Sequence, residues 1–528
     1  MNHGLTLGVF AILVAAMLGV IVWAGRRTKT TTDFWAAGRS IGSAQNGLAV
    51  AGDFMSAGTF LGTAGLIFLT GFDGTLILLA ALFGFLPLLF LMAERLRNAG
   101  AFTLADVLAL RFGGNGVRSA AAIATIVVSF FYLFSQLVAA GTLLTVLSGL
   151  NFAVAVLITG VFMTLYVVLG GMLGATWVMV VKAVMLLAVG VVLTIAILAH
   201  TGGSLSELNG LAVAHSSAHA AFLQPGQLLP DNTPLTKLDI VSYGLIYMLG
   251  TAGLPHVMIR FFTVRNGALA RRSLGWAIGV MGFFFLVVIV IGLGARALLT
   301  GSVATEATGS GGNLVAPILA RQLGGGASTA GGDISLAIVA GIAFLTILAV
   351  VSGLLISTAG AVAHDLWSRV LKGGSAAAAA SEPKVARYAA VGMGALATVV
   401  SIIVGSSFNI TFLLSLAFLV AASANLPVIL LTLFWRGFTK TGAIAGLLGG
   451  LAISLIVIVL SPTVLSSDPV ITLHYPGIIS IPAGFACCLI GTALSRRERG
   501  ADSFEEMSVA TELGRLELAE AEAAVPAG

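Results

Sequence analysis

Thirteen long apolar stretches divide this chain, and each is long enough to cross a bilayer as a helix, which takes about 20 residues. They lie at residues 5–25, 44–67, 75–95, 119–148, 152–170, 176–199, 240–262, 273–298, 333–364, 388–407, 409–434, 441–461 and 476–495. Only 9% of the residues are charged, whereas a soluble domain carries about 25%. The sequence therefore predicts an all-α integral membrane protein of about 13 transmembrane helices, which lies in the lipid bilayer and does not bind nucleic acid.

Two of the expected spans contain residues that break a helix. The stretch Ala49–Gly65 is rich in Gly, Ala, Ser and Thr, which let a helix unwind, and it holds a carboxylate, Asp53, at membrane depth. The stretch Gly250–Phe262 contains Pro255, which cannot donate a backbone hydrogen bond. Broken helices at matching positions of two halves are typical of transporter sites. The alternative for each stretch is that its glycines only allow close helix packing.

The two breaks lie five spans apart, on spans that run in opposite directions. This relation predicts two inverted five-helix repeats. The expected organisation is a transporter domain at 1–498, made of an extra helix at 5–25, repeats at 44–199 and 240–434 and extra helices at 441–495, followed by a tail at 499–528. The tail is acidic, and we expect it to be solvated and partly disordered, with a short amphipathic helix as the alternative.

Basic residues gather in alternate connections. They are Arg26, Arg27, Lys29, Arg39, Arg95, Arg97, Arg111, Arg118, Arg265, Arg271, Arg272, Arg369, Lys372, Lys384, Arg387, Arg436, Lys440, Arg496, Arg497 and Arg499. The positive-inside rule then places the N-terminus outside and the C-terminus in the cytoplasm, which requires an odd number of spans. We expect irregular outer loops, a cytoplasmic linker at Gly373–Pro383 and, from the Ala- and Gly-rich composition, a bacterial plasma (inner) membrane.

Five motifs connect the chain to a known family. They are DFWAAGR at 33–39, QNGLA at 45–49, GDFMSAGTFLG at 52–62, GTAGLPHVMIRFFTV at 250–264 and AHDLW at 363–367. Together they resemble the solute:sodium symporter family, and most of all its cation/acetate (monocarboxylate) branch. The resemblance implies a LeuT-like core and the uptake of acetate, propionate or pyruvate with a cation by alternating access.

A small carboxylate needs hydrogen-bond donors, and the half-helix ends at the two breaks would supply them. The candidate substrate-binding residues are Asp53, Ser56, Gly250 and Gly253 at the breaks, and Tyr132 and Gln136 on the fourth span. Packing bonds between helices are the alternative for Tyr132 and Gln136. Asp53 has two interpretations, because it could handle a cation or proton in a cavity or cap the start of a half-helix.

The resemblance also implies a sodium site, and this chain departs from the family there. Backbone carbonyls of the site correspond to Gly52 and Met55, while the family's hydroxyl pair falls on Ala349 and Val350, which have no side-chain oxygen. Thr346 is the nearest hydroxyl one turn earlier. Because a hard cation needs oxygen ligands, the loss of two should weaken sodium binding.

A lysine, Lys182, appears on the sixth span close to the position where the family carries an acid near the ion path. We therefore expect either proton coupling through Lys182 or a lysine that substitutes for sodium. Two alternatives remain open. Lys182 could extend to the cytoplasmic interface, and sodium could still bind through the remaining ligands.

His256 and Arg260 follow the second break, and we expect an inner gate or structural pairs rather than substrate contact. The leading function is secondary symport, with no cofactor beyond a coupling Na⁺ or H⁺. A membrane sensor of organic acids is an alternative, although a tail of about 30 residues is too short for an attached catalytic domain. A channel is another, because broken helices also line pores. Neither an HExxH motif nor a nucleophile with a His partner indicates an enzyme.

Overall fold

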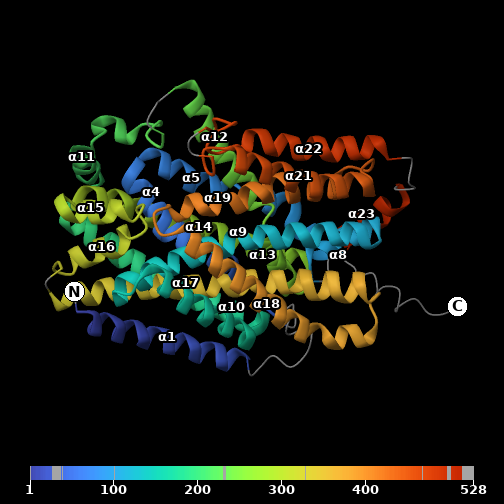
Figure 1. The fold of residues 1–528 in the computed structure, drawn as a ribbon, viewed down its shortest axis with the longest axis horizontal. Helices are drawn as coiled ribbons and strands as arrows, with labels where there is room; N and C mark the ends of the chain where they lie inside the picture. The colour runs from blue at the N-terminus through green and yellow to red at the C-terminus, as the bar shows by residue number, and fades with distance from the viewer. Residues whose placement is uncertain are drawn as a thin grey trace.

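The computed structural model describes residues 2–25, 37, 40–99, 102–229, 233–327, 329–465, 468–495 and 501–513. These residues form helices and connections without a strand (Figure 1). Eleven helices are long and apolar enough to cross a membrane, and a pair bent by 59° adds a twelfth. A shorter apolar helix at Phe152–Thr164 corresponds to the remaining expected span. The motif at 33–39 lies outside the described residues except for Ala37.

The membrane-crossing elements follow the expected order. They are α1 (His3–Gly25), α3 (Ser43–Phe54) with η2 (Gly58–Gly62) and α4 (Thr63–Thr70), α5–α7 (Phe72–Ala99), α9 (Asn115–Ser148), α10 (Phe152–His200), α12 (Pro234–Thr251) with α13 (Pro255–Met258) and η5 (Ile259–Thr263), α14 (Gly267–Leu298), α17 (Ala330–Ala359) with η6 (Gly360–Leu371), α18 (Ala376–Val404), α19 (Ile410–Val420) with η7 (Ala421–Asn425) and α20 (Leu426–Phe434), α21 (Lys440–Leu460) and α22 (Gly477–Leu494).

Helix α10 contains both the fifth and the sixth expected spans. A straight helix of its 49 residues would be about 74 Å long, more than twice the hydrocarbon thickness of about 30 Å. Its first part packs on α18, where Thr164 lies beside Gly394, and its second part packs on α14, where Ile197 lies beside Gly294. The predicted short connection at 170–175 is therefore part of a continuous helical backbone.

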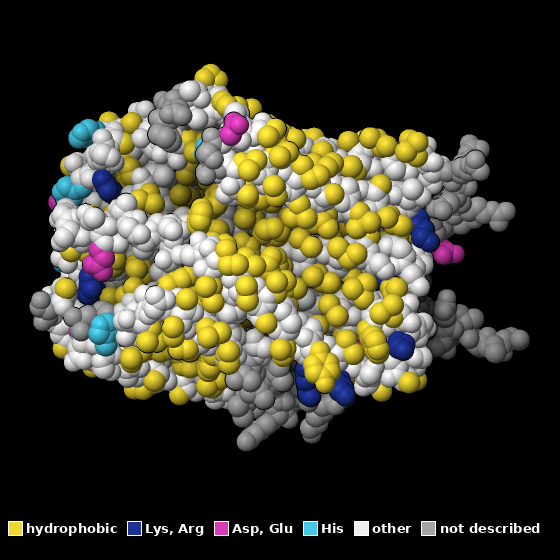
Figure 2. All heavy atoms as spheres, in the orientation of Figure 1, with side chains coloured by type: hydrophobic (Ala, Val, Ile, Leu, Met, Phe, Trp, Pro, Cys, Tyr) yellow, Lys and Arg dark blue, Asp and Glu magenta, His cyan; other side chains and the backbone are white. Residues whose placement is uncertain are grey.

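Apolar side chains cover the middle of the visible face, charged side chains lie around its periphery, and the visible histidines gather toward one end (Figure 2). Helix α1 begins at one end of the molecule, and α8 (Leu104–Phe112) and α23 (Ala501–Leu513) lie at the other (Figure 1). We call this second end the α8 face. The positions of α1 and α23 at opposite ends agree with an odd number of crossings between them.

The connections at the opposite end are more regular than the sequence indicates. They contain α11 (Leu205–His215), η4 (His219–Leu223), α15 (Gly301–Gly309) and α16 (Val315–Leu323), so the expectation of irregular loops is wrong. A buried carboxylate orders one of them. Asp73 accepts hydrogen bonds from the backbone N–H groups of Gly226, Gln227 and Leu228 at 2.6–3.1 Å. Local composition alone predicts an irregular loop here, because Asp73, which orders the segment, lies more than 150 positions earlier in the chain.

At the α8 face the expectation of a linker is also wrong, whereas the first part of the tail follows the alternative of a short helix. The segment predicted as a linker enters α18 at Ala376, because an alanine run favours a helix once a serine caps it, and the Ser375 hydroxyl accepts from the Ala378 N–H. The first part of the acidic tail is the ordered helix α23, with Met507 fully buried and Thr511 bonded through its carbonyl to Asn98. Residues 514–528 lie outside the described residues.

Candidate functional site

The first break lies in the middle of the second span. Helix α3 ends at Phe54, and the chain bends by 59° before the span continues. The Thr59 hydroxyl accepts a hydrogen bond from the Ser56 N–H at 2.9 Å and donates one to the Phe54 carbonyl at 2.8 Å. The Thr59 side chain thus pairs two backbone groups that lose their helical partners at the break. Such groups must be paired within the protein, because the interior of a membrane offers no water.

The second break separates α12 from α13. Helix α12 ends at Thr251, Pro255 starts α13, and the Asn425 amide donates to the Gly253 carbonyl at 2.9 Å. A Cβ atom on Gly250 or on Gly253 would lie 2.4 Å from a carbonyl oxygen of the α19–η7 helix. The structure thus places these two candidate substrate residues at a close contact between helix backbones.

A buried ion pair joins the two broken helices. Arg260 donates from Nε to Asp53 Oδ2 at 2.5 Å and from Nη2 to Oδ1 at 3.3 Å, and both side chains are 0% exposed. Its Nη1 also donates to the Thr176 hydroxyl at 2.9 Å on α10. Asp53 is therefore bound to a guanidinium, a partner that the sequence does not indicate. Arg260 and Asp53 tie three helices together, and Thr176 is an unforeseen third member.

Lys182 points into the same region from α10. Its side chain is 1% exposed, and Nζ donates to the Thr346 carbonyl on α17 at 3.3 Å. One turn before Lys182, the Met179 carbonyl lies only 2.6 Å from where a Cβ on Gly52 would be. The ammonium therefore lies between the first break and α17, where the resemblance implies a sodium ion, and it does not reach the membrane interface.

Two other candidate ion ligands, Thr346 and Ala349, make hydrogen bonds within their own helix. The Thr346 hydroxyl donates to the Ile342 carbonyl at 2.9 Å, and the Ala349 carbonyl accepts from the Ser352 hydroxyl at 2.6 Å. Met55 is fully buried at the end of α3.

Four polar side chains, at the breaks and on α9, are buried and make no hydrogen bond within the part of the chain that the structure describes. They are Ser56 and His256 at the breaks and Ser129 and Gln136 on α9, with both ring nitrogens of His256 and both amide atoms of Gln136 unpaired. Ser129, Tyr132 and Gln136 share one face of α9, since they are three and four residues apart. The Tyr132 ring meets His256 edge-on at 4.8 Å and therefore brings α9 to the second break. Buried polar groups are normally paired, so this cluster is a candidate ligand site.

Phenylalanine rings pack beside Tyr132. The Phe418 ring centroid lies 5.9 Å from that of Phe54 and 6.2 Å from that of Tyr132. Sequence reasoning included Ser56, Tyr132 and Gln136 as substrate residues, assigned His256 to a gate and missed Ser129. A helical-face pattern around Tyr132 and Gln136 could have found Ser129.

Comparisons with known proteins agree with this architecture. The family model described as the sodium:solute symporter family matches residues 34–450, well over half of the chain. The chain belongs to this family. It is 42% identical to the uncharacterized symporter YwcA of Bacillus subtilis, over 96% of this chain and 97% of that one. It is 40% identical to the monocarboxylic acid transporter of Corynebacterium glutamicum, over 96% and 94% of the two chains.

Solved structures show the fold of this symporter. A Na⁺-coupled sialic acid symporter in a substrate-bound outward-open state has a TM-score of 0.70 at 18% identity, over 93% of this chain and 98% of that one. The nucleobase-cation-symport-1 family transporter Mhp1 in a closed conformation has a TM-score of 0.53 at 14% identity, over 94% and 99%. The predicted LeuT-like membrane fold is therefore confirmed, and the symporter is a transporter rather than an enzyme.

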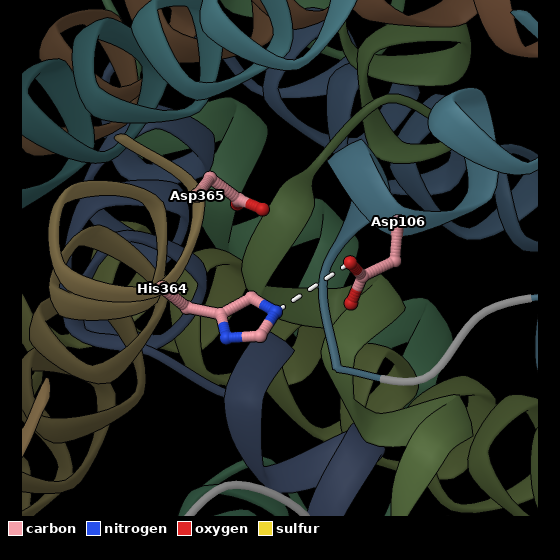
Figure 3. Close-up of side chains that lie close together, drawn as sticks. All are labelled: Asp106, His364 and Asp365. Carbon is pink, nitrogen blue, oxygen red and sulfur yellow. Dashed lines mark ion pairs between the residues drawn. The ribbon is translucent and has the colours of Figure 1, made fainter. Parts of the chain in front are cut away.

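A second buried charge cluster lies at the α8 face of the symporter (Figure 3). Asp106, His364 and Asp365 bring their ligand atoms within 4.8 Å of one another, as a metal site would. However, Arg118 Nη1 lies 2.8 Å from Asp106 Oδ1 and 2.7 Å from Asp365 Oδ1 and supplies a cation. His364 lies between Asp106 at 3.5 Å and Glu382 at 3.2 Å. We interpret the cluster as an ion-pair network.

Asp365 of this network and two residues of the second span, Pro255 and Ile259, line one small pocket. This pocket of about 10 Å³, the room that one water molecule needs, extends from Asp365 to Pro255 and Ile259. The network joins α8, α9, η6 and α18, so separating these elements would widen this pocket toward the break.

Replacing Asp106 by asparagine should lower the stability of the symporter at pH 7 by about 1–3 kcal/mol. Burial alone raises the pKa of Asp106, but the hydrogen bond and charge of His364 and the charge of Arg118 outweigh burial and lower it below its usual value. Because the pKa of Asp106 is lower in the folded than in the unfolded protein, its ionised form stabilises the fold. This stabilisation is complete above about pH 4, the pKa of an unfolded aspartate, and is lost progressively as the pH falls below it.

Thermal unfolding in detergent at pH 7 and pH 3 would measure this effect. We expect the gap in unfolding temperature between the wild type and Asp106→Asn to narrow at pH 3. A gap of equal size at both pH values would contradict the assignment.

Proposed function

We propose that this symporter takes up short monocarboxylates together with a proton carried by Lys182, across a bacterial plasma membrane with the α8 face in the cytoplasm. The observation that carries the substrate assignment is the group of buried, unpartnered polar side chains beside the two helix breaks. Ser56, Gln136 and His256 offer donors to an acid that is acceptor-only when ionised. The relative at 40% identity named as a monocarboxylic acid transporter supports this class.

The charges around the site support coupling to a cation. Asp53 and Arg260 cancel one another, and Lys182 interacts electrostatically with both. A protonated Lys182 gives the three groups a net charge of +1, which a monocarboxylate neutralises. A substrate anion therefore favours the protonated lysine, and by reciprocity the proton favours substrate binding.

The position of Lys182 supports a proton rather than sodium as the coupling ion. The ammonium donates to the Thr346 carbonyl, and Ala349 offers no side-chain oxygen for a metal ion. A buried ammonium without its own carboxylate is costly, so Lys182 can release its proton once the substrate anion has left. Gly52, Met55 and Thr346 would then form the wall around the lysine.

Uptake of labelled acetate and pyruvate into proteoliposomes tests the proposal. We expect an imposed proton gradient, acid outside, to accumulate both acids without sodium, and counterflow to show carrier rather than channel behaviour. Strict sodium dependence would overturn the proton assignment. Failure to take up either acid under a proton gradient or a sodium gradient would overturn the monocarboxylate assignment.

A further inference from the structure

An open groove runs along the side of the membrane span α14 that faces outward, beside α10. Its volume is about 620 Å³, and the residues that line it include Arg272, Gly275, Trp276, Gly279 and Phe283 of α14 and Leu187 of α10. The α14 residues recur three and four positions apart, so they form one face of the helix. A Cβ atom on Gly275 or Gly279 would meet no described atom of another helix within 4 Å, so the two glycines leave this face open. We call it the α14 groove.

Two aromatic side chains of the α14 groove are turned toward the membrane. Trp276 is 58% exposed and Phe283 is 52% exposed. Tryptophan is enriched where a span meets the lipid headgroups. Arg272 and Phe283 are 11 positions apart, which is about 16 Å of helix and about half of a hydrocarbon core of about 30 Å. The groove therefore has the length of an acyl chain in one leaflet.

The α14 groove has a positively charged end. Arg272 lines it, Arg271 precedes it, and both are exposed. Within the described residues neither arginine forms an ion pair, unlike the arginines of the networks above. This end lies at the α8 face, because Gly267 at the start of α14 lies beside Asn98, which donates to the Thr511 carbonyl of α23.

We propose that the α14 groove binds one anionic phospholipid from the leaflet at the α8 face. Its phosphate accepts from Arg272 and Arg271, and an acyl chain lies in the groove against Trp276 and Phe283. Unpaired basic residues beside a membrane span favour an anionic over a zwitterionic headgroup. The site also adjoins the first broken helix, because a Cβ atom on Gly47 of α3 would lie 2.5 Å from the Cβ atom of Trp276.

Lipid titration of the purified symporter in mild detergent tests the proposal. Native mass spectrometry would compare phosphatidylglycerol and phosphatidylcholine with identical acyl chains. We expect phosphatidylglycerol to bind about twentyfold more tightly, since it lacks the cationic choline that opposes the two arginines. Glycerol phosphate carries a similar charge without the chains, so it should not compete.

Two kinds of variant test the two parts of the site. Arg271→Gln/Arg272→Gln should remove the preference for phosphatidylglycerol, at roughly fivefold for each arginine. Gly279→Leu fills the groove and should weaken the binding of both lipids by about tenfold, because it displaces the acyl chain. The matched controls are Arg387→Gln and Gly392→Leu, both exposed on α18, where a Cβ on Gly392 also meets open space.

Each outcome bears on the proposal. Equal binding of the two lipids by the wild type would overturn the headgroup assignment. Unchanged affinity in Gly279→Leu would overturn the placement of the chain in the groove. A loss in Arg387→Gln equal to that in the double arginine variant would show general attraction to basic residues and no site. All the substituted positions are exposed, so the variants should fold, and gel filtration would check this.

Discussion

Asp53→Asn is expected to destabilise this symporter by about 3–5 kcal/mol, because it removes the carboxylate that pairs with the buried Arg260 guanidinium. Both side chains are 0% exposed, so water cannot replace the lost carboxylate. The charge of Asp53 also acts on Lys182 without direct contact, so the variant removes this longer-range attraction as well. The variant would therefore bury two cationic side chains, Arg260 and Lys182, without the negative charge of Asp53.

The measurement is the unfolding temperature in detergent, with Asp468→Asn as the matched control, because Asp468 is exposed in a connection. The double variant Asp53→Asn/Arg260→Gln removes both charges and should recover part of the loss, since the two sites share one interaction. If Asp53→Asn unfolded at the same temperature as Asp468→Asn, the ion pair would not stabilise the fold as we describe.

Lys182→Gln is expected to reduce proton-driven accumulation of the substrate by about a hundredfold, near the upper end of typical coupling between two ligand sites. Glutamine can still donate to the Thr346 carbonyl, which Lys182 contacts at 3.3 Å, but it carries no proton between the two sides. Exchange of labelled for unlabelled acid requires no net proton movement and should persist.

Lys182→Arg separates charge from proton transfer. An arginine keeps the positive charge but does not release its proton, so we expect exchange without accumulation. Lys237→Gln is the matched control, because Lys237 is exposed near the start of α12. Full proton-driven accumulation by Lys182→Gln would exclude Lys182 as the proton carrier and return the ion to Gly52, Met55 and Thr346.

Several features of the fold follow from local sequence alone. The spans are visible as apolar runs because a helix in lipid satisfies its backbone internally and needs apolar side chains throughout. The two breaks are visible because Gly and Pro weaken a helix wherever they occur. Asp53 is recognisable as a special residue because a carboxylate is rare at membrane depth.

The candidate site could be predicted only in part. Ser56, Tyr132 and Gln136 are recognisable as polar residues on apolar spans, yet the sequence did not show that His256 lies against Tyr132. A helix in the acidic tail was only the alternative to a solvated tail, because the stability of α23 depends on a docking surface, where Met507 is buried and Asn98 bonds Thr511. The sequence of the tail alone does not reveal this docking surface, because Asn98 lies more than 400 positions before Thr511.

By itself the sequence determined the membrane class, the order of the spans, the two broken helices and the family of this protein. Only the tertiary structure decided which charges meet: Asp53 with Arg260, 207 positions away, Lys182 with the Thr346 carbonyl, and Arg118 with both Asp106 and Asp365. The physical reason is that hydropathy and helix breaking act over a few residues of chain. The partner of a buried charge depends instead on which helices pack together in space.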